Sequence, residues 1–556
     1  MPWTERTIYQ IYPKSFYDSN GDGIGDIRGI IEKIPYIASL GIDMVWFNPF
    51  FASPQHDNGY DISDYYNIDP NMGTMDDVEE LIQKLKAHNI DVMFDMVLNH
   101  VSTEHPWFQK ALAGEKKYHD YFYIQAPQQD GSLPTNWESK FGGPAWEPFG
   151  KTGLYYLHLY DKTQADLNWH NPNVREELFN IVNFWLNKGV RGLRFDVLNV
   201  IGKDKQLCDA PAGVVDKTLY TDTPHVHSWV KELHQKTFGA YQNVITVGEM
   251  SSTTIEHSIG YTKPSRDELS MVFSFHHLKV DYDKGQKWTN TRFDFALLKE
   301  TLNEWALRMQ DGGGWNALFF NNHDQPRALN RFGDAQQYRQ ESATMLATVT
   351  HMLRGTPYIY QGEEIGMVDP TYSQINQYVD VEAHHAYQSL REQGLSDVEA
   401  FNIVRTKARD NSRVPMAWNH STYGGFSDVQ PWLMPTHAQQ INVAQEERDG
   451  RILPYYRKLI QLRKQYAVIA RGTYAPYQLE HPDIYAFFRE DHKHRMLVLT
   501  NFYGKNSTIS VPEEFSHAQI LLNNREEEPQ LTQSTITLEP YQALVLLYSH
   551  SANKEH

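Results

Sequence analysis

Short apolar runs that end in polar or acidic residues recur along the first two thirds of the chain, and stretches with helical periodicity separate them. This alternation is expected for a parallel sheet in which a helix follows each strand. The eight runs lie at residues 7–12, 42–47, 90–97, 190–197, 243–250, 271–275, 316–322 and 356–361. Eight strand–helix units predict an α/β protein with a (β/α)₈ (TIM) barrel.

The spacing of these runs also predicts where the chain departs from a simple barrel. The connection between the third and fourth runs is rich in Gly, Pro, Trp and Tyr and longer than one crossover helix needs, so we expect a small inserted domain at 101–170. Helical patterns after the eighth run predict a helical insertion at about 367–450. Alternating strand-like runs predict a C-terminal antiparallel β domain at 473–556. The barrel then takes residues 1–100 and 171–472.

Charge and composition exclude several classes of partner for this chain of 556 residues. The formal net charge of −18 repels nucleic acid, and no basic run reverses this locally. The single cysteine, Cys208, excludes an intramolecular disulfide and favours a reducing compartment, so we expect a cytoplasmic protein. The N-terminal residues lack the pattern of a signal peptide, and no apolar stretch is long enough for a membrane span. The oligomeric state stays open.

Three carboxylates follow separate apolar runs. Asp196, Glu249 and Asp324 lie at the ends of the fourth, fifth and seventh runs. Because the active site of a (β/α)₈ barrel lies at the C-terminal ends of its strands, we expect these acids to converge on one cleft. Glycosidic cleavage needs one ionised carboxylate and one protonated carboxylic acid, so the set suits a glycoside hydrolase. The alternative is that strand-end acids cap helices or pair with barrel arginines, which is a weaker explanation for three acids than for one.

Neighbouring residues suggest which acid takes which role. Arg194 lies two residues before Asp196 in the same predicted strand, so both side chains point to the same side of the pleat. Arg194 can therefore hold Asp196 ionised, as a nucleophile requires. Glu249 lies near other acids at an apolar strand tip, so we expect its pKa to be raised, as a general acid requires.

Five motifs, in order, resemble those of the α-amylase superfamily, family 13 of the glycoside hydrolases. They are DMVLNH at 95–100, QADLNW at 164–169, GLRFDVLN at 192–199, VGEM at 247–250 and NNHDQP at 321–326. The resemblance extends from YQIYPKSF near the N-terminus to the C-terminal β domain. It implies a retaining α-glycoside hydrolase with Asp196 as nucleophile and Glu249 as acid/base. It further implies that Asp324 is a third acid, which grips sugar hydroxyls and favours the distorted ring.

The same resemblance implies a pocket that clamps the terminal glucose. Its residues are Tyr60, Asp61, His100, Arg194, His323 and Arg413. Asp61 with Arg413 is similar to the pair that blocks further sugars and makes such enzymes exo-acting. Without the resemblance, two simpler interpretations remain, in which Tyr60 only packs and Arg413 lies on the surface of the helical insertion.

Residues 18–26, DSNGDGIGD, resemble the first part of an EF-hand loop. Oxygen-bearing side chains alternate with glycines at Asp18, Asn20, Asp22 and Asp26, and such hard ligands suit Ca²⁺. A full EF-hand is excluded because no bidentate Glu follows, and such strings often form only turns. The loop resembles the calcium site of bacterial oligosaccharide-cleaving members of the superfamily. This implies the backbone carbonyl of Ile24 as a further ligand and a stabilising role for the ion.

The segment 273–288, FSFHHLKVDYDKGQKW, gathers cations in a strongly acidic chain. These are His276, His277, Lys279, Lys284 and Lys287. A phosphate group could dock there, although a lysine run is more often a solvated surface. Val197 after the predicted nucleophile resembles relatives that act on α-1,6 or α,α-1,1 bonds.

The leaving-group side resembles one branch of the family more closely. HHLKVDY at 276–282, with PTNWESKFGG, GEMSST and GGGWNALFF, resembles the trehalose-6-phosphate hydrolases. The resemblance implies a phosphorylated disaccharide, α,α-trehalose 6-phosphate, as substrate, with His276, Lys279 and Lys287 at its phosphate. Alternatives are an oligo-1,6-glucosidase for isomaltose-type sugars, which shares every catalytic residue, and a sucrose isomerase. A non-catalytic scaffold is disfavoured, because transporter heavy chains with this barrel lose the acids and carry a membrane anchor.

Overall fold

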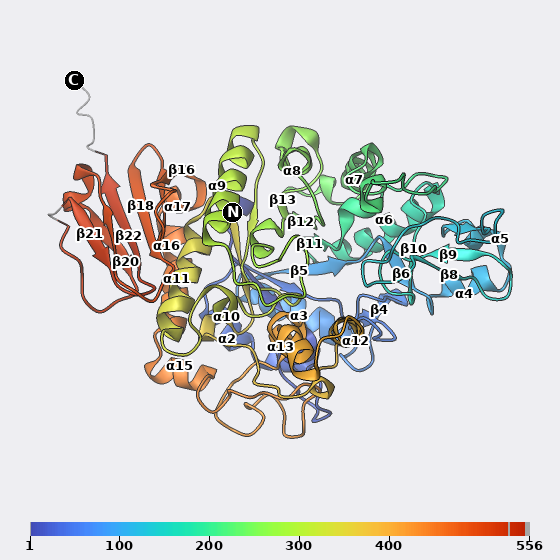
Figure 1. Ribbon diagram of the computed structural model, residues 1–556, viewed down its shortest axis with the longest axis horizontal. Coiled ribbons are helices and arrows are strands. Elements are labelled where there is room, and N and C mark those ends of the chain that lie inside the picture. The colour runs from blue at the N-terminus through green and yellow to red at the C-terminus, as the bar shows by residue number, and fades with distance from the viewer. Residues whose placement is uncertain (1, 532–533, 551–556) are drawn as a thin grey trace. The chain divides into compact units, whose positions relative to one another are not determined.

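The computed structural model describes residues 2–531 and 534–550 in two compact units. We call Met44–Phe275 the middle unit, and Met1–Asp43 with His276–His556 the terminal unit. Figure 1 labels their helices and strands. The outermost residues of two predicted domain ranges, residue 1 and residues 551–556, lie outside the described residues.

The middle unit contains five parallel strands in the order β13-β12-β11-β5-β2. They are β2 (Met44–Phe47), β5 (Asp91–Met96), β11 (Gly192–Phe195), β12 (Ile245–Glu249) and β13 (Met271–Phe273). Nearly all their residues are buried, as expected for a parallel sheet covered on both faces. The helices α3 (Met75–Ala87), α6 (Pro172–Asn187), α7 (Pro224–Lys236) and α8 (Ile255–Thr262) follow these strands along the chain.

The terminal unit contains three further parallel strands in the order β1-β15-β14. They are β1 (Ile8–Ile11), β14 (Ala317–Leu318) and β15 (Thr356–Tyr360), with the helices α1 (Ile27–Glu32), α2 (Ile34–Ser39), α9 (Phe295–Gly312), α10 (Ala328–Phe332), α11 (Arg339–Met352), α16 (Ile452–Gln465) and α17 (Ala467–Arg471). Each of the eight parallel strands in the two units lies inside one predicted apolar run. The predicted (β/α)₈ fold class is therefore confirmed.

Small antiparallel sheets interrupt the barrel pattern between β5 and β11. The strand β6 (His100–Ser102) pairs with β10 (Gln164–Asp166), and β9 (Tyr155–Leu157) lies between β7 (Ile124–Gln125) and β8 (Trp146–Pro148). Along the chain, α4 (Pro106–Leu112) and α5 (Lys116–His119) lie between β6 and β7. The antiparallel pair β3 (Phe51–Ala52) and β4 (Asp64–Ile68) comes before β5. Trp137 and Trp146 are buried in one apolar core with Val197 and Val200. These aromatic side chains therefore fill a core.

Within the terminal unit, the predicted helical and β segments are present. The helices α12 (Val381–Glu392), α13 (Asp397–Lys407), α14 (Asp410–Arg413) and α15 (Val443–Asp449) follow β15, and part of this segment has its own apolar core. The C-terminal sheet has the order β16-β17-β18-β22-β20, with a separate β19–β21 pair (Figure 1). Its strands are β16 (Thr473–Tyr477), β17 (Ile484–Glu490), β18 (His494–Asn501), β19 (Ser507–Ser510), β20 (Gln519–Asn523), β21 (Thr535–Leu538) and β22 (Ala543–Ser549). Across the described ranges, no helix is long and apolar enough to cross a membrane.

A buried histidine makes the stability of the terminal unit depend on pH. His351 in α11 is 1% exposed, and its ring lies against Tyr456 of α16. Burial, assisted by Arg463, lowers the pKa of His351 to about 3. Because the unfolded chain protonates this histidine near its ordinary pKa of about 6.5, the folded state binds fewer protons between these two values.

We therefore predict that the folded state loses stability as the pH falls from 7 to 5, and that His351→Gln removes part of this loss. The wild-type unfolding free energy should drop by roughly 2 kcal/mol more than that of the variant, as the proton linkage of one such group requires. Urea unfolding at both pH values measures this difference. Equal losses in the two proteins would show that His351 does not set the pH dependence.

Candidate active site

Arg194 is the centre of the charged group in the middle unit. It lies in β11, whose register places it beside Asp95 of β5 and Val247 of β12. Its Nη1 donates to both oxygens of Asp95, at 3.0 and 3.2 Å, and to Oδ1 of Asp196 at 2.6 Å. Its Nη2 forms an ion pair with Glu249. Three neighbouring strand ends therefore direct one carboxylate each to the same guanidinium.

The charge of Arg194 is maintained by these acids. The side chain is 1% exposed, so burial opposes its charge. Asp95, Tyr60 and Asp196 outweigh burial and raise the pKa of Arg194 above its ordinary value. The expected contact between Arg194 and Asp196 is present, but Arg194 also contacts Glu249. The arginine alone therefore does not distinguish a nucleophile from an acid.

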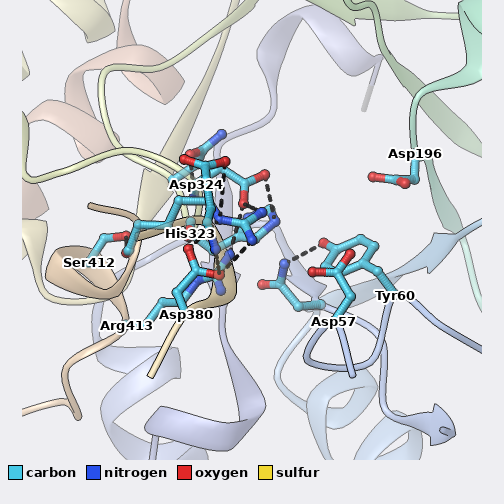
Figure 2. Close-up of polar contacts among 12 residues, drawn as sticks. Asp57, Tyr60, Asp196, His323, Asp324, Asp380, Ser412 and Arg413 are labelled. Carbon is cyan, nitrogen blue, oxygen red and sulfur yellow. Dashed lines mark hydrogen bonds and ion pairs between the residues drawn. The ribbon is translucent and has the colours of Figure 1, made fainter. Parts of the chain in front are cut away.

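Tyr60 and Trp46 enclose this group. The hydroxyl of Tyr60, a residue labelled in Figure 2, donates to Asp95 Oδ2 at 2.9 Å and accepts from Asn48 Nδ2 at 2.7 Å. Trp46 Nε1 donates to the same Asp95 oxygen at 3.1 Å, and the Arg194 guanidinium lies 4.9 Å from a Trp46 ring centroid. Tyr60 therefore does more than pack, because it orients Asp95.

Two other residues of the predicted glucose pocket belong to the middle unit. Asp61 is fully buried, and its carboxylate accepts the backbone N–H groups of His56 and Asp57 at 2.9 and 3.0 Å. Burial raises the pKa of Asp61 despite these hydrogen bonds. His100 follows β5, and burial lowers its pKa to about 4. His100 is therefore a neutral imidazole near pH 7, suited to hydrogen bonds with uncharged hydroxyl groups.

The backbone turns sharply immediately after Asp196. Val197 has φ 39° and ψ 41°, a left-handed conformation that a β-branched residue rarely adopts. The Asp196 N–H still donates to Met96 O at 3.0 Å, so the carboxylate is presented at the point where β11 ends. Strained backbone of this kind is found preferentially at functional sites.

Asp324 is the centre of a second group, which lies within the terminal unit (Figure 2). Its Oδ1 accepts from Arg413 Nη2 at 2.9 Å and lies 3.4 Å from Arg409 Nη1. Its Oδ2 lies 3.2 Å from His323 Nε2. Gln10 Nε2, which can only donate, is 2.9 Å from His323 Nδ1, so the Nε2 proton of His323 faces Asp324. Burial opposes the charge of Asp324, but His323, Arg409 and Arg413 hold its pKa well below the usual range.

Arg413 is buried and does not lie on the surface of the helical insertion. It is 2% exposed, and its Nε donates to His323 O at 2.8 Å. Its Nη1 is also buried and has no hydrogen-bond partner among the described residues. The surface interpretation of Arg413 is therefore wrong, because the side chain is enclosed with Asp324.

The cations of segment 273–288 have different surroundings. His276 is partly buried, and burial together with Lys279 lowers its pKa to about 4, so its ring is neutral near pH 7. Lys279 and Lys284 are exposed, and Lys284 lies with Gly285 in a tight turn between Asp283 and Gln286. Lys287 is ion-paired with Glu382 of α12 and lies 4.6 Å from a ring centroid of Trp288.

The acidic loop at 18–26 folds on its own backbone. Asp18 accepts the N–H groups of Asn20, Gly21 and Gly23 at 3.2, 2.8 and 2.8 Å. Asp26 caps α1 by accepting from Gly29 N at 2.7 Å. Burial, with a contribution from Asp18, raises the pKa of Asp26. Among the described residues there is no group of three or more His, Cys, Asp or Glu placed to hold a metal ion.

Comparison with known proteins identifies the protein family to which this chain belongs. Residues 10–472 match the catalytic domain of the alpha amylases, and residues 484–545 match the alpha-amylase SusG C-terminal domain. The chain therefore belongs to the alpha-amylase family, and it is a glycoside hydrolase.

Individual relatives are similar over their whole length. The trehalose-6-phosphate hydrolase of Bacillus subtilis (strain 168) is 46% identical, over 98% of this chain and 97% of its own. The oligo-1,6-glucosidase of Parageobacillus thermoglucosidasius is 44% identical, over 98% of both chains. The crystal structure of the Bacillus licheniformis trehalose-6-phosphate hydrolase superimposes with a TM-score of 0.95 at 46% identity, covering 99% of this chain and 100% of that one.

Several site residues are assigned no role by the sequence alone. Asp95 ends the third apolar run and satisfies the same strand-tip rule as Asp196, so its signal was available. Arg409 and Asp380 lie in the helical insertion, where no strand end marks them. Only the folded chain brings them to Asp324.

Proposed function

We propose that this enzyme cleaves α,α-trehalose 6-phosphate to glucose and glucose 6-phosphate with retention of configuration. The observation that carries the proposal is identity over nearly the full length with two trehalose-6-phosphate hydrolases, 46% for Bacillus subtilis (strain 168) and 44% for Escherichia coli (strain K12). Lys279 and Lys287 in segment 273–288 support it, because lysine forms charge-assisted hydrogen bonds with a phosphate group.

In the proposed reaction, Asp196 attacks the anomeric carbon of the terminal glucose. Glu249 donates its proton to the glycosidic oxygen, that bond breaks, and glucose 6-phosphate leaves. Glu249 then takes a proton from water, whose oxygen attacks the same carbon and releases glucose from Asp196. Because Arg194 contacts both acids, it balances their negative charge while the proton moves between Glu249 and the substrate.

We propose a role in binding the terminal glucose for residues of each group, taken one unit at a time. In the terminal unit, Asp324, held ionised, accepts hydrogen bonds from sugar hydroxyls, and in the middle unit neutral His100 adds a donor. Tyr60 bounds the pocket next to Asp95. The buried Nη1 of Arg413, with no partner among the described residues, supports a role for Arg413 in binding a sugar hydroxyl.

For the phosphate, we propose Lys279 and Lys287 as the charged contacts. His276 contributes at most a neutral hydrogen bond, since its pKa of about 4 leaves it uncharged near pH 7. Lys287 is fixed in place by Glu382, which limits the rearrangement needed on binding. A phosphorylated sugar does not cross membranes freely, and the single cysteine favours a reducing compartment, so we place the enzyme in the cytoplasm.

We also propose that Asp18, Asn20, Asp22, Asp26 and the carbonyl of Ile24 hold a structural Ca²⁺. The hard oxygen donors fit this ion, and Asp18 and Asp26 are two buried acids that repel each other without a cation. A bound Ca²⁺ would supply positive charge that stabilises the loop, and no catalytic step is assigned to it.

The substrate is tested by comparing kcat/KM for trehalose 6-phosphate, trehalose, isomaltose and maltose under identical conditions. We expect trehalose 6-phosphate to be preferred. If isomaltose is cleaved at least as well, the proposal fails and the oligo-1,6-glucosidase function replaces it, in keeping with the 44% identity to one such enzyme.

We predict that Asp196→Asn and Glu249→Gln each lower kcat by at least about a thousandfold without unfolding the protein. Each change removes one acid from a two-carboxylate mechanism and keeps nearly the same volume. Steady-state kinetics gives the loss, and the melting temperature controls for folding. Near-normal turnover in either variant would contradict its assigned role.

We predict that Lys279→Ala lowers kcat/KM for trehalose 6-phosphate by about one to two orders of magnitude. A charge-assisted hydrogen bond to phosphate contributes roughly 1.5–3 kcal/mol, and unphosphorylated trehalose has no such contact. Lys284→Ala, an exposed lysine five positions further along, serves as the matched control. An equal loss of kcat/KM on trehalose 6-phosphate and on trehalose would show that Lys279 has a structural role and does not bind the phosphate.

We predict that chelation lowers the melting temperature more than it lowers the initial rate. An ion that binds only the folded state stabilises that state, so its removal should lower the melting temperature. The initial rate should change less, because the proposed calcium takes no part in the reaction. Calorimetry with a chelator, followed by addition of Ca²⁺ or Mg²⁺, measures the effect. An unchanged melting temperature, also for Asp22→Ala, would remove the calcium proposal.

A further inference from the structure

Arg409 joins the helical insertion to Asp324. Its guanidinium forms a two-point contact with Asp380, with Nε 2.8 Å from Oδ2 and Nη2 2.8 Å from Oδ1. Its third nitrogen, Nη1, lies 3.4 Å from Asp324 Oδ1. The side chain is 9% exposed, so water competes little for these contacts.

Asp380, which pairs with Arg409, is held in place by hydrogen bonds of the surrounding backbone. Asp380 is the N-terminal cap of α12, and its own N–H and that of Val379 donate to Asp410 Oδ2 at 2.8 and 2.7 Å. Asp410 is the first residue of α14, next to Arg409. The starts of α12 and α14 are therefore bound to each other, and Arg409 has little freedom to move away from Asp324.

Arg409 and Arg413 act on the same oxygen of Asp324. They are four residues apart, and Arg413 Nη2 donates to Oδ1 at 2.9 Å. The family resemblance accounts for Arg413 as a residue of the sugar pocket, but it assigns nothing to Arg409. A buried ion pair between Arg409 and Asp380 is also a poor source of stability, because desolvation offsets most of its attraction.

We propose that Arg409 is a positioning residue for glycoside cleavage, which acts by fixing the carboxylate of Asp324. Asp380 holds Arg409, so the start of α12 determines how Asp324 is oriented. The inference rests on the proposed role of Asp324 in gripping sugar hydroxyls, and it does not depend on whether the leaving group carries a phosphate.

Removing Arg409 should weaken binding of the transition state and leave binding of the substrate almost unchanged. Asp324 is proposed to bind the distorted ring better than the relaxed sugar, so a misplaced carboxylate costs transition-state binding. Removing Arg409 should then lower kcat with little change in KM. A defect of folding alone would lower the amount of active enzyme and leave the affinity for all ligands unchanged.

The test compares Asp380→Asn with the double variant Arg409→Gln/Asp380→Asn. The double variant leaves no unpaired buried charge from this pair, and the single variant keeps the arginine beside Asp324. The probes are a chromogenic aryl α-glucoside, a glucose-shaped iminosugar inhibitor and glucose itself. Melting temperature and active-site titration report folding, and Arg409→Lys provides a variant that keeps the charge.

We expect less than a tenfold loss of kcat for Asp380→Asn and about a tenfold to hundredfold loss for the double variant, by analogy with other charge-assisted contacts. KM should change less than about threefold, the inhibition constant of the iminosugar should rise with the loss of kcat, and that of glucose should not. Arg409→Lys should lie between wild type and the double variant.

The proposal is overturned if the double variant keeps the wild-type kcat, if KM rises while kcat holds, or if the loss follows the melting temperature. If the double variant does not fold, Arg409→Lys decides alone, since an unchanged iminosugar affinity contradicts positioning. The aryl glucoside carries no phosphate, so a wild-type enzyme that fails on trehalose 6-phosphate removes the proposed substrate and leaves this test intact.

Discussion

The buried guanidinium of Arg194 determines the arrangement of the middle unit's charged residues. Asp95, Asp196 and Glu249 end neighbouring strands, and three carboxylates enclosed at that spacing repel one another. One enclosed arginine removes most of this repulsion, and the acids in turn keep the arginine charged. The strand register then fixes the directions of the acids, because each leaves its strand at a point set by backbone hydrogen bonding. The chemistry of this group therefore depends on the geometry of the sheet.

The group around Asp324 has the opposite balance of charge. One carboxylate is surrounded by Arg409, Arg413 and His323, so it stays ionised over the whole working range of pH. The group around Arg194 instead has three carboxylates for one arginine, so one of the three can carry a proton without leaving the arginine unpaired. The two carboxylates of a retaining mechanism, the acid/base Glu249 and the nucleophile Asp196, are both proposed in the group around Arg194. Asp324 is proposed only to bind sugar hydroxyls, a role that needs a carboxylate that stays ionised.

Local sequence patterns predicted the fold and part of the site. Each barrel strand is a short apolar run, and an acid at its end is identified by the run before it, as at Asp196 and Glu249. The pairing of Arg409 with Asp380 has no such pattern, because it depends on how the segment after β15 packs against itself. The same holds for Lys287 and Glu382, which are 95 residues apart. The metal site at 18–26 stays a prediction, because the hydrogen bonds that this loop makes to its own backbone would also form in a turn without a metal.

The segment 273–288 carries the lysines that we propose as contacts of the substrate's phosphate. A change of leaving group must leave the balanced acids and arginines untouched, because any added charge among them alters which acid holds the proton. In this chain the positive charge proposed for the phosphate lies instead at exposed Lys279, near a His276 that burial keeps neutral. Lys287 brings its own counter-ion, Glu382, and so adds no net charge near the arginines. Selectivity for a charged leaving group can then evolve in a surface turn, while the catalytic carboxylates keep a constant environment.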